Sequence, residues 1–126
     1  MNYLIDSSLW IEYLSGSRAG EEVNKIINSD DEIYSLAVII SEVTSKVRRS
    51  KSNVELAYES VIKNSRIFDI SPKIAKEAGI LHATMKDKYG SFPLVDSLII
   101  CSARALNAKI LTTDNHFKSF KEARIL

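Results

Sequence analysis

The sequence predicts an α/β fold in which a mainly parallel central sheet is flanked by helices. Short apolar runs alternate with longer segments whose apolar residues recur at helical spacing. Two of the short runs end near an aspartate, Asp6 or Asp114, that stands before a new helical segment. The chain has only two prolines and four glycines, so long linkers are not expected. Its length suits one domain, residues 1–126, that buries a core of its own.

In the N-terminal part of the chain we expect two strands and four helices. Ser7 or Ser8 is suited to cap the first helix, because a serine hydroxyl can accept a bond from a free backbone N–H. The stretch SGSRAG, residues 15–20, is expected to separate the first two helices. The expected strands cover residues 3–5 and 32–34, and the expected helices cover residues 9–14, 21–28, 36–49 and 53–63.

The same alternation continues in the C-terminal part. Ser71 followed by Pro72 is a good helix start, because the N–H that proline lacks would have no partner at the first helical position. Pro93 opens a further helix after the break YGSFP. The expected strands cover residues 66–70, 108–112 and 124–126, and the expected helices cover residues 71–88, 94–105 and 115–121.

Composition and charge narrow the class of protein. The formal net charge is only +1, so any basic surface must be local. Cys101 is the single cysteine, which excludes an internal disulfide and fits a reducing compartment. The N-terminal residues lack the features of a signal peptide, and no apolar run has the length that spans a membrane. We therefore expect a soluble, cytoplasmic protein without a membrane partner.

Three carboxylates have ordinary explanations when each is considered alone. Asp6 and Asp114 are suited to cap the helices that follow them. Glu42 could belong to an exposed, ion-paired stripe with Lys46 and Arg49, which follow it at helical spacings. These explanations stay open at the level of the sequence.

Asp96 is harder to explain in this way. It is the only fully charged residue between Leu94 and Ala103, in a helix that is apolar on most sides. The N-terminus of a helix favours an anion by only about 0.3–1 kcal/mol, which is small beside the cost of burying an uncompensated charge. We therefore expect Asp96 to need a cationic partner, although the helix dipole remains the alternative.

The four positions are more informative together. If the strands are parallel, Asp6 and Asp114 share one edge of the sheet, and the helices that carry Glu42 and Asp96 could pack beside it. Neighbouring carboxylates raise one another's pKa unless a cation lies among them. Carboxylate oxygens favour Mg²⁺ or Mn²⁺, whereas two histidines and one cysteine leave little for a zinc site. Such a cation suits phosphodiester hydrolysis, in which Glu42 could hold or deprotonate the attacking water.

The order of these motifs resembles that of PIN domains, the fold of many Mg²⁺-dependent ribonucleases. The matching stretches are LIDSS around Asp6, ISEV around Glu42, LVDSLIICSA around Asp96 and LTTDNHF around Asp114. They extend over essentially the whole chain. The compact length is most similar to the VapC-type toxins of bacterial and archaeal toxin–antitoxin pairs.

This resemblance implies one acidic pocket whose members also hold the metal: Asp6, Glu42, Asp96 and Asp114. It further implies that the hydroxyls of Ser8 and Thr112 support these ligands or hold water. His116 stands where many relatives carry another acid, which would make the pocket less acidic. The partners that the resemblance implies are an RNA substrate, a small antitoxin and a second copy of the chain in a homodimer.

A basic cluster follows Glu42 along the same predicted helix and contains Lys46, Arg48 and Arg49. Lys46 and Arg49 share a helix side with Glu42 and could hold the phosphate backbone of RNA. Alternatively, these cations only complement the C-terminal end of the helix.

Other polar residues receive ordinary interpretations. His82 and His116 lack a metal-type spacing, so structural or surface roles are favoured for both, although His116 is near enough to Asp114 to touch the pocket. Lys86 and Lys88, beside Tyr89, are interpreted as a solvated helix end.

We therefore expect a Mg²⁺- or Mn²⁺-dependent endoribonuclease of PIN fold that is the toxin of a toxin–antitoxin pair. One alternative is a PIN module with weak catalysis that acts by binding RNA or a protein. Another is a receiver-like phosphoacceptor domain, which also places acids at strand ends. That fold needs a lysine at the end of a late strand, whereas Lys109 stands at a strand start.

Overall fold

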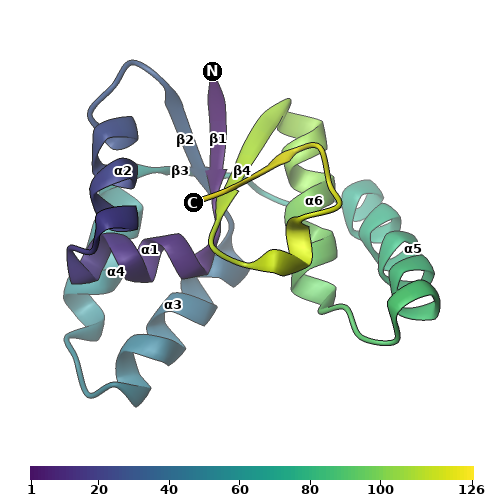
Figure 1. Cartoon of the computed structure of the whole chain (residues 1–126), viewed down its shortest axis with the longest axis horizontal. Coiled ribbons are helices and arrows are strands. Elements are labelled where there is room, and N and C mark those ends of the chain that lie inside the picture. Colours follow the sequence, from purple (N-terminus) through teal and green to yellow (C-terminus); the bar gives the residue numbers. More distant parts are fainter.

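The computed structural model describes residues 1–126 as a parallel sheet surrounded by helices (Figure 1). The elements in chain order are β1 (Asn2–Ile5), α1 (Ser7–Ser15), α2 (Arg18–Ile27), β2 (Glu32–Ser35), α3 (Ala37–Arg49), α4 (Val54–Asn64), β3 (Arg66–Ile67), α5 (Pro72–Tyr89), α6 (Leu94–Leu106), β4 (Ala108–Thr112), the 3-10 turn η1 (Asn115–Phe117) and β5 (Ala123–Ile125). None of these helices combines the length and the apolar character that crossing a membrane requires.

The five strands form one sheet in the order β3-β2-β1-β4-β5, and every neighbouring pair is parallel. The expected α/β fold with a parallel central sheet is therefore confirmed. β1 is the central strand, and its Leu4 is in register with Tyr34 of β2 and Ile110 of β4. This register brings the C-terminal ends of β1 and β4 to the same edge of the sheet.

The core lies around the central strands. Leu4 and Ile5 of β1 and Ile110 and Leu111 of β4 are fully buried, as expected for parallel strands that are covered on both faces. In Figure 1, α1 to α4 gather on the left of the strands, and α5 and α6 gather on the right. α6 contacts both β1 and β4, and α1 contacts β4 as well as α2 and α3.

The break between α1 and α2 is shorter than the sequence indicates. Only Gly16, which ends α1 with a left-handed φ of +72°, and Ser17 lie between the two helices. The Ser17 hydroxyl accepts a bond of 3.1 Å from the Gly20 backbone N–H, and α2 therefore begins at Arg18 rather than near Glu21. A side chain on Gly20 would collide with the Glu12 carbonyl of α1, so the tight crossing of the helices requires a glycine there.

Two C-terminal expectations need a correction. β3 covers only two residues instead of five, because the chain leaves the sheet edge after the bond from the Phe68 N–H to the Ser35 carbonyl. The expected helix over 115–121 is a single 3-10 turn, since Phe117 is fully buried and the chain must turn back at once to form β5. The remaining elements agree with the expected ones to within about two residues at each end.

Candidate functional site

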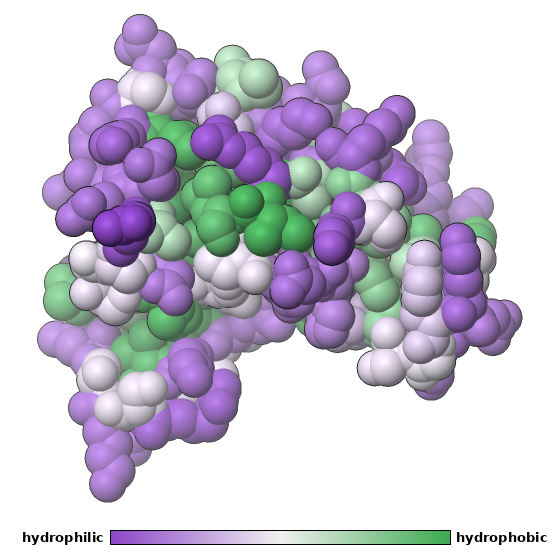
Figure 2. Space-filling model, viewed as in Figure 1, coloured by the Kyte–Doolittle hydropathy of each residue, from purple (hydrophilic) through white to green (hydrophobic).

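The carboxyl ends of the central strands point into a hollow of the surface. Figure 2 shows that the molecule is indented at its lower edge, between the part formed by α3 and α4 and the part formed by α5 and α6. Asp6 directly follows β1, and Asp114 follows β4 after one intervening residue. Ligand sites of open parallel sheets form beyond this edge.

Asp6 caps α1 and contacts the end of β4 at the same time. Its Oδ1 accepts a bond of 2.8 Å from the Ser7 backbone N–H, so Asp6 is the N-cap of α1. The expectation that Ser7 or Ser8 caps this helix is wrong, because α1 already begins at Ser7. Its Oδ2 accepts a bond of 2.8 Å from the Thr112 hydroxyl and one of 3.3 Å from the Ser8 hydroxyl. Asp6 therefore caps the helix through Oδ1 and contacts the end of β4 through Oδ2. Both interpretations of this residue can hold at the same time.

Thr112 and Ser8 join the two strand ends. The fully buried Thr112 hydroxyl donates to Asp6 and accepts a bond of 2.9 Å from the Asp114 backbone N–H. The Ser8 hydroxyl lies 3.3 Å from that of Thr112 and accepts a bond of 3.1 Å from the Thr113 N–H. These bonds hold the carboxylates of Asp6 and Asp114 at a fixed spacing.

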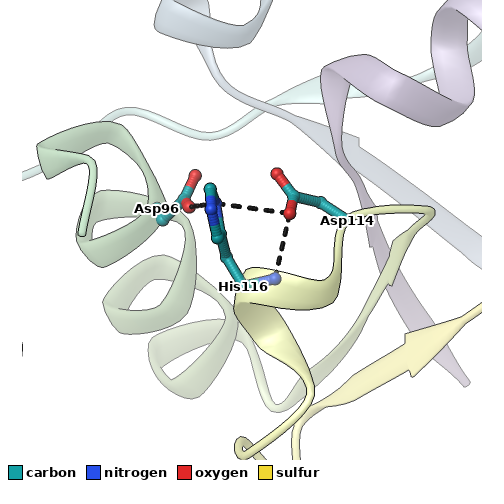
Figure 3. Close-up of side chains that lie close together, drawn as sticks. All are labelled: Asp96, Asp114 and His116. Atoms are coloured by element: carbon teal, nitrogen blue, oxygen red, sulfur yellow. Dashed lines mark hydrogen bonds and ion pairs between the residues drawn. The ribbon is translucent and has the colours of Figure 1, made fainter. Parts of the chain in front are cut away.

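Asp96, Asp114 and His116 form the most compact group at this edge (Figure 3). One ligand atom from each of them lies within 4.8 Å of the others. The His116 Nδ1 is 3.3 Å from the Asp96 Oδ2 and 3.3 Å from the Asp114 Oδ1. Asp114 also caps η1, because its Oδ1 accepts a bond of 2.9 Å from the His116 N–H.

Asp96 lies in the first turn of α6 and is only 7 % exposed. Its Oδ2 has no hydrogen-bond partner, since the nearby His116 ring is not aligned to donate to it. Burial raises the pKa of Asp96 to about 7, the charges of Asp6 and Asp114 add to this rise, and His116 opposes it. The helix dipole favours an anion in this first turn by only about 0.3–1 kcal/mol, which is small beside the cost of burying a charge.

Glu42 reaches the same region from the second turn of α3, and its Oε1 is buried without a partner. Burial raises its pKa, the charges of Asp6 and Asp114 contribute, and the Ser7 side chain opposes the rise. Burial likewise raises the pKa of Asp6, and the charge of Asp114 adds to it against the bonds from Thr112 and Ser7. The ion-paired stripe is not present, because no ion pair joins Glu42 to a basic residue.

We call Asp6, Glu42, Asp96 and Asp114 the acidic cluster. The structure brings both Glu42 and Asp96 within electrostatic reach of Asp6 and Asp114, but Glu42 and Asp6 stand outside the compact group of Asp96, Asp114 and His116. Buried carboxylate oxygens without partners, with raised pKa values, fit a hard divalent cation among them. Asp6, Asp96, Asp114 and Glu42 are the side chains that could hold it.

A cleft of about 580 Å³ opens beside the acidic cluster, between α1 and α3. Glu42, Lys46 and Arg49 line it from α3, and Ser7, Ser8 and Glu12 line it from α1. We call it the basic cleft. Arg48 is exposed but does not line the cleft, so the structure brings only two of the three expected cations to the site.

Two residues lie closer to the acids than the sequence predicts. His116 contacts two of the acids, although a surface or structural role was favoured for it, and Ser7 lies beside Glu42. The position of His116 two residues after Asp114 was the available signal. That signal is weak, because the ring reaches α6 only through the 3-10 turn η1, and the sequence did not predict this turn.

Comparison with known proteins identifies the fold. A chain of VapBC2 from Rickettsia felis, solved bound to a DNA fragment from their promoter, has a TM-score of 0.72 and 20 % identity over 100 % of this chain and 98 % of its own. VapC20 of Mycobacterium tuberculosis, described as a Sarcin-Ricin loop cleaving toxin, has a TM-score of 0.72 and 15 % identity over 97 % and 98 %. The VapBC-1 structure from nontypeable Haemophilus influenzae has a TM-score of 0.72 and 20 % identity over 100 % and 97 %.

At these identities the likeness concerns the fold, and it is the fold of VapC-type toxins, as the sequence motifs indicated. Comparison with the curated proteins gives no significant match. The sequence model of the PIN domain matches residues 3–123, which is nearly the whole chain. The chain therefore belongs to the PIN domain family.

Proposed function

We propose that this protein is a Mg²⁺- or Mn²⁺-dependent endoribonuclease that hydrolyses phosphodiester bonds of RNA and acts as the toxin of a toxin–antitoxin pair. Its catalytic and metal-binding residues are Asp6, Glu42, Asp96 and Asp114. The observation that carries the proposal is the gathering of these four carboxylates at the ends of β1 and β4, beside a cleft to which Lys46 and Arg49 contribute. The raised pKa values of Asp6, Glu42 and Asp96 agree with it. A site with that charge distribution suits a substrate that is itself an anion and reacts with help from a divalent cation.

Each group then has a task. Asp6, Asp96 and Asp114 would hold the divalent cation, which would lower the pKa of water and offset negative charge on the phosphate. Glu42 orients the attacking water and accepts its proton, since its Oε1 is buried and free of other bonds. The water oxygen bonds to the phosphorus while the bond from phosphorus to the leaving oxygen breaks in line with it, and solvent supplies a proton to the leaving oxygen.

Neighbouring residues prepare the site and position the substrate. The hydroxyls of Ser8 and Thr112 fix Asp6 in one orientation through bonds of 3.3 and 2.8 Å to its Oδ2. Lys46 and Arg49, which line the basic cleft, bind phosphates on one side of the scissile bond. Their side chains form no ion pairs in the structure, so they are available to phosphates.

The toxin assignment draws on the relatives, several of which are named as toxin–antitoxin complexes. We propose that a small antitoxin protein silences this chain, that the chain forms a homodimer and that it works in the cytoplasm, where its RNA substrate is found. Light scattering of the purified protein tests the dimer. Toxicity of the expressed chain that a co-expressed neighbouring small open reading frame relieves tests the antitoxin.

The activity is tested by incubating the protein with total RNA and with short labelled RNAs, with Mn²⁺, with Mg²⁺ or with EDTA. We expect cleavage that requires a metal and is absent in the Asp96→Asn variant. The matched control is Asp69→Asn, which alters an exposed aspartate far along the sequence from the acidic cluster. Full activity of Asp96→Asn would overturn the assignment.

A weakly catalytic PIN module that binds RNA is the second candidate, and the contact of His116 with two of the acids favours it. The imidazole contacts the same two carboxylates that a divalent cation would use. RNA binding that persists without any metal-dependent cleavage would support this candidate. The receiver-like alternative loses support, because Lys109 lies near the start of β4 and donates to the Lys121 carbonyl.

A further inference from the structure

His116 is the one basic side chain inside the compact group at the strand ends. Its Nδ1 lies 3.3 Å from both the Asp96 Oδ2 and the Asp114 Oδ1 (Figure 3). The same ring atom thus faces a carboxylate of α6 and a carboxylate that follows β4. The His116 side chain is 52 % exposed, so burial of the ring does not account for this position.

The backbone holds the ring in this position. The His116 N–H donates a bond of 2.9 Å to the Asp114 Oδ1, and the next residue, Phe117, is fully buried in the core. The turn η1 is therefore fixed at both sides of the histidine. The ring stands over Asp96 as a consequence of this turn rather than of a flexible surface loop.

The spacing of these atoms is that of ligands around one cation. Donor atoms at about 2.1 Å from an octahedral ion lie about 3.0 Å from each other along the edges of the octahedron, and tetrahedral edges are slightly longer. The two observed separations of 3.3 Å match these edges with little movement. The buried Asp96 Oδ2 lacks a hydrogen-bond partner and points into the group, which independently favours a cation site here.

We propose that the His116 Nδ1 is itself a ligand of the divalent cation, so that the centre has mixed nitrogen and oxygen donors and selects Mn²⁺ over Mg²⁺. The inference rests on the metal site of the proposed function, but it does not depend on RNA cleavage. Imidazole nitrogen binds transition-metal ions well, whereas Mg²⁺ prefers oxygen ligands and keeps its waters. A purely carboxylate cluster would lack this discrimination.

The competing explanation is that His116, in its protonated form, is only a counter-ion for the acids. It would then compete with any divalent cation. The two explanations make opposite predictions for its removal. Loss of a ligand weakens Mn²⁺ binding, whereas loss of a competing counter-ion strengthens the binding of Mn²⁺ and Mg²⁺ alike.

The test is calorimetric titration of the full chain with Mn²⁺ and separately with Mg²⁺, using wild type, His116→Ala and His116→Asp. We expect His116→Ala to weaken Mn²⁺ binding by about tenfold or more and Mg²⁺ binding much less. His116→Asp should move the preference toward Mg²⁺. His82→Ala, which changes the other histidine of the chain, is the matched control and should bind both ions as wild type does.

Pulsed electron paramagnetic resonance of bound Mn²⁺ gives a readout that activity cannot. We expect nitrogen modulation from a bound imidazole in wild type and in His82→Ala, and none in His116→Ala. If Mn²⁺ binds wild type but not Asp96→Asn, and the bound ion shows no nitrogen modulation, the histidine ligand is overturned. The proposed metal site itself would then remain. A wild type that binds neither ion would overturn both. Tighter binding by His116→Ala would establish the counter-ion explanation instead.

Discussion

One carboxylate with little exposure lies near each end of α6, and the charges around the two carboxylates differ. Near its last turn, the Arg104 Nε lies 2.9 Å from the Oε1 of Glu122, whose side chain is 13 % exposed. At its first turn, the side chain of Asp96 is 10 % exposed and has only His116 and other acids around it. The exposed fractions of the Glu122 and Asp96 side chains are thus similar, whereas the charges around the two carboxylates differ.

The pKa values follow this difference. Burial alone would raise the pKa of Glu122, but the hydrogen bond and the positive charge of Arg104 outweigh it and hold the pKa below its ordinary value. At Asp96, burial and the neighbouring acids act in the same direction and raise the pKa to about 7. The chain can supply a guanidinium for a buried carboxylate. Where it gathers carboxylates without one, as around Asp96, the arrangement supports the proposed divalent cation.

The largest contrast is expected from removing one negative charge at each end of α6. Asp96→Asn should reduce metal-dependent RNA cleavage by at least about a hundredfold, because it removes a proposed metal ligand. Glu122→Gln should leave cleavage unchanged and lower only stability. Single-turnover cleavage and urea unfolding of both variants measure the two effects. Equal losses of activity in both variants would mean that cleavage responds to any charge change along α6. The difference between Asp96 and Glu122 would then have no bearing on function.

Stability of the metal-free protein should fall as the pH rises. Asp96 has a folded-state pKa of about 7 against an ordinary value of 3.8, so the folded chain holds a proton that the unfolded chain has lost. The free energy of unfolding therefore decreases between about pH 4 and pH 7, by on the order of 2–4 kcal/mol at about 1.4 kcal/mol per pKa unit. Urea unfolding in EDTA measures this.

The control for that measurement is Asp96→Asn, in which the slope should be much smaller. Added Mn²⁺ should restore stability at neutral pH in wild type and not in the variant. The contribution of Glu122 has the opposite sign, because its folded pKa is lowered. It is present above the ordinary value of 4.5 and is lost as the pH falls through the folded pKa. A wild type whose stability rises from pH 4 to 7 would contradict the account of Asp96.

Breaking the paired end should have a smaller, purely structural effect. Arg104→Ala leaves the Glu122 carboxylate without its partner and removes the contact of the guanidinium with the Phe120 ring. Because the Arg104 side chain is 48 % exposed, solvent screens much of the interaction, and we expect a loss of about 1 kcal/mol. Urea midpoints check this. The double variant with Glu122→Gln should lose little more, since both changes remove the same pair.

The smallest effect concerns the two neighbouring arginines of α3. Arg49→Ala should weaken RNA binding a few-fold and reduce the slope of log affinity against log salt by about 0.7–1, because one phosphate contact is lost. Arg48→Ala is the matched control, since Arg48 is exposed but does not line the basic cleft. Fluorescence anisotropy of a labelled RNA measures both affinities. Each arginine variant is combined with Asp96→Asn, so that the RNA is not cleaved during the measurement. Equal salt slopes for the two variants would mean that these arginines only complement the C-terminal end of the helix.

Much of the fold could be predicted because its signals are local. Apolar runs, the serine cap at Ser71 and the proline at the start of α5 are read from a few neighbouring residues. The helical spacing of Glu42, Lys46 and Arg49 likewise anticipated that they would line one cleft, because a helix has a fixed period. The start of α2 was missed, since Gly16 and Ser17 alone are sufficient to turn the chain.

The acids at the strand ends were intermediate cases. Asp6 and Asp114 could be expected together once the strands were taken as parallel, since parallel strands end at a common edge. That each of them also caps a helix shows why the local explanation and the functional one could not be separated by sequence alone. One carboxylate has two oxygens and can serve both.

By itself the sequence determined the alternation of elements, the apolar faces and the isolation of Asp96 in an apolar helix, because these depend on the order of neighbouring residues. Only the tertiary structure decided which charges meet. It placed His116 against Asp96 and Asp114, and Arg104 against Glu122, across separations of 20 and 18 residues for the pairs that involve α6. The energy of a charge depends on what surrounds it in space, and that surrounding is fixed by packing rather than by position in the chain.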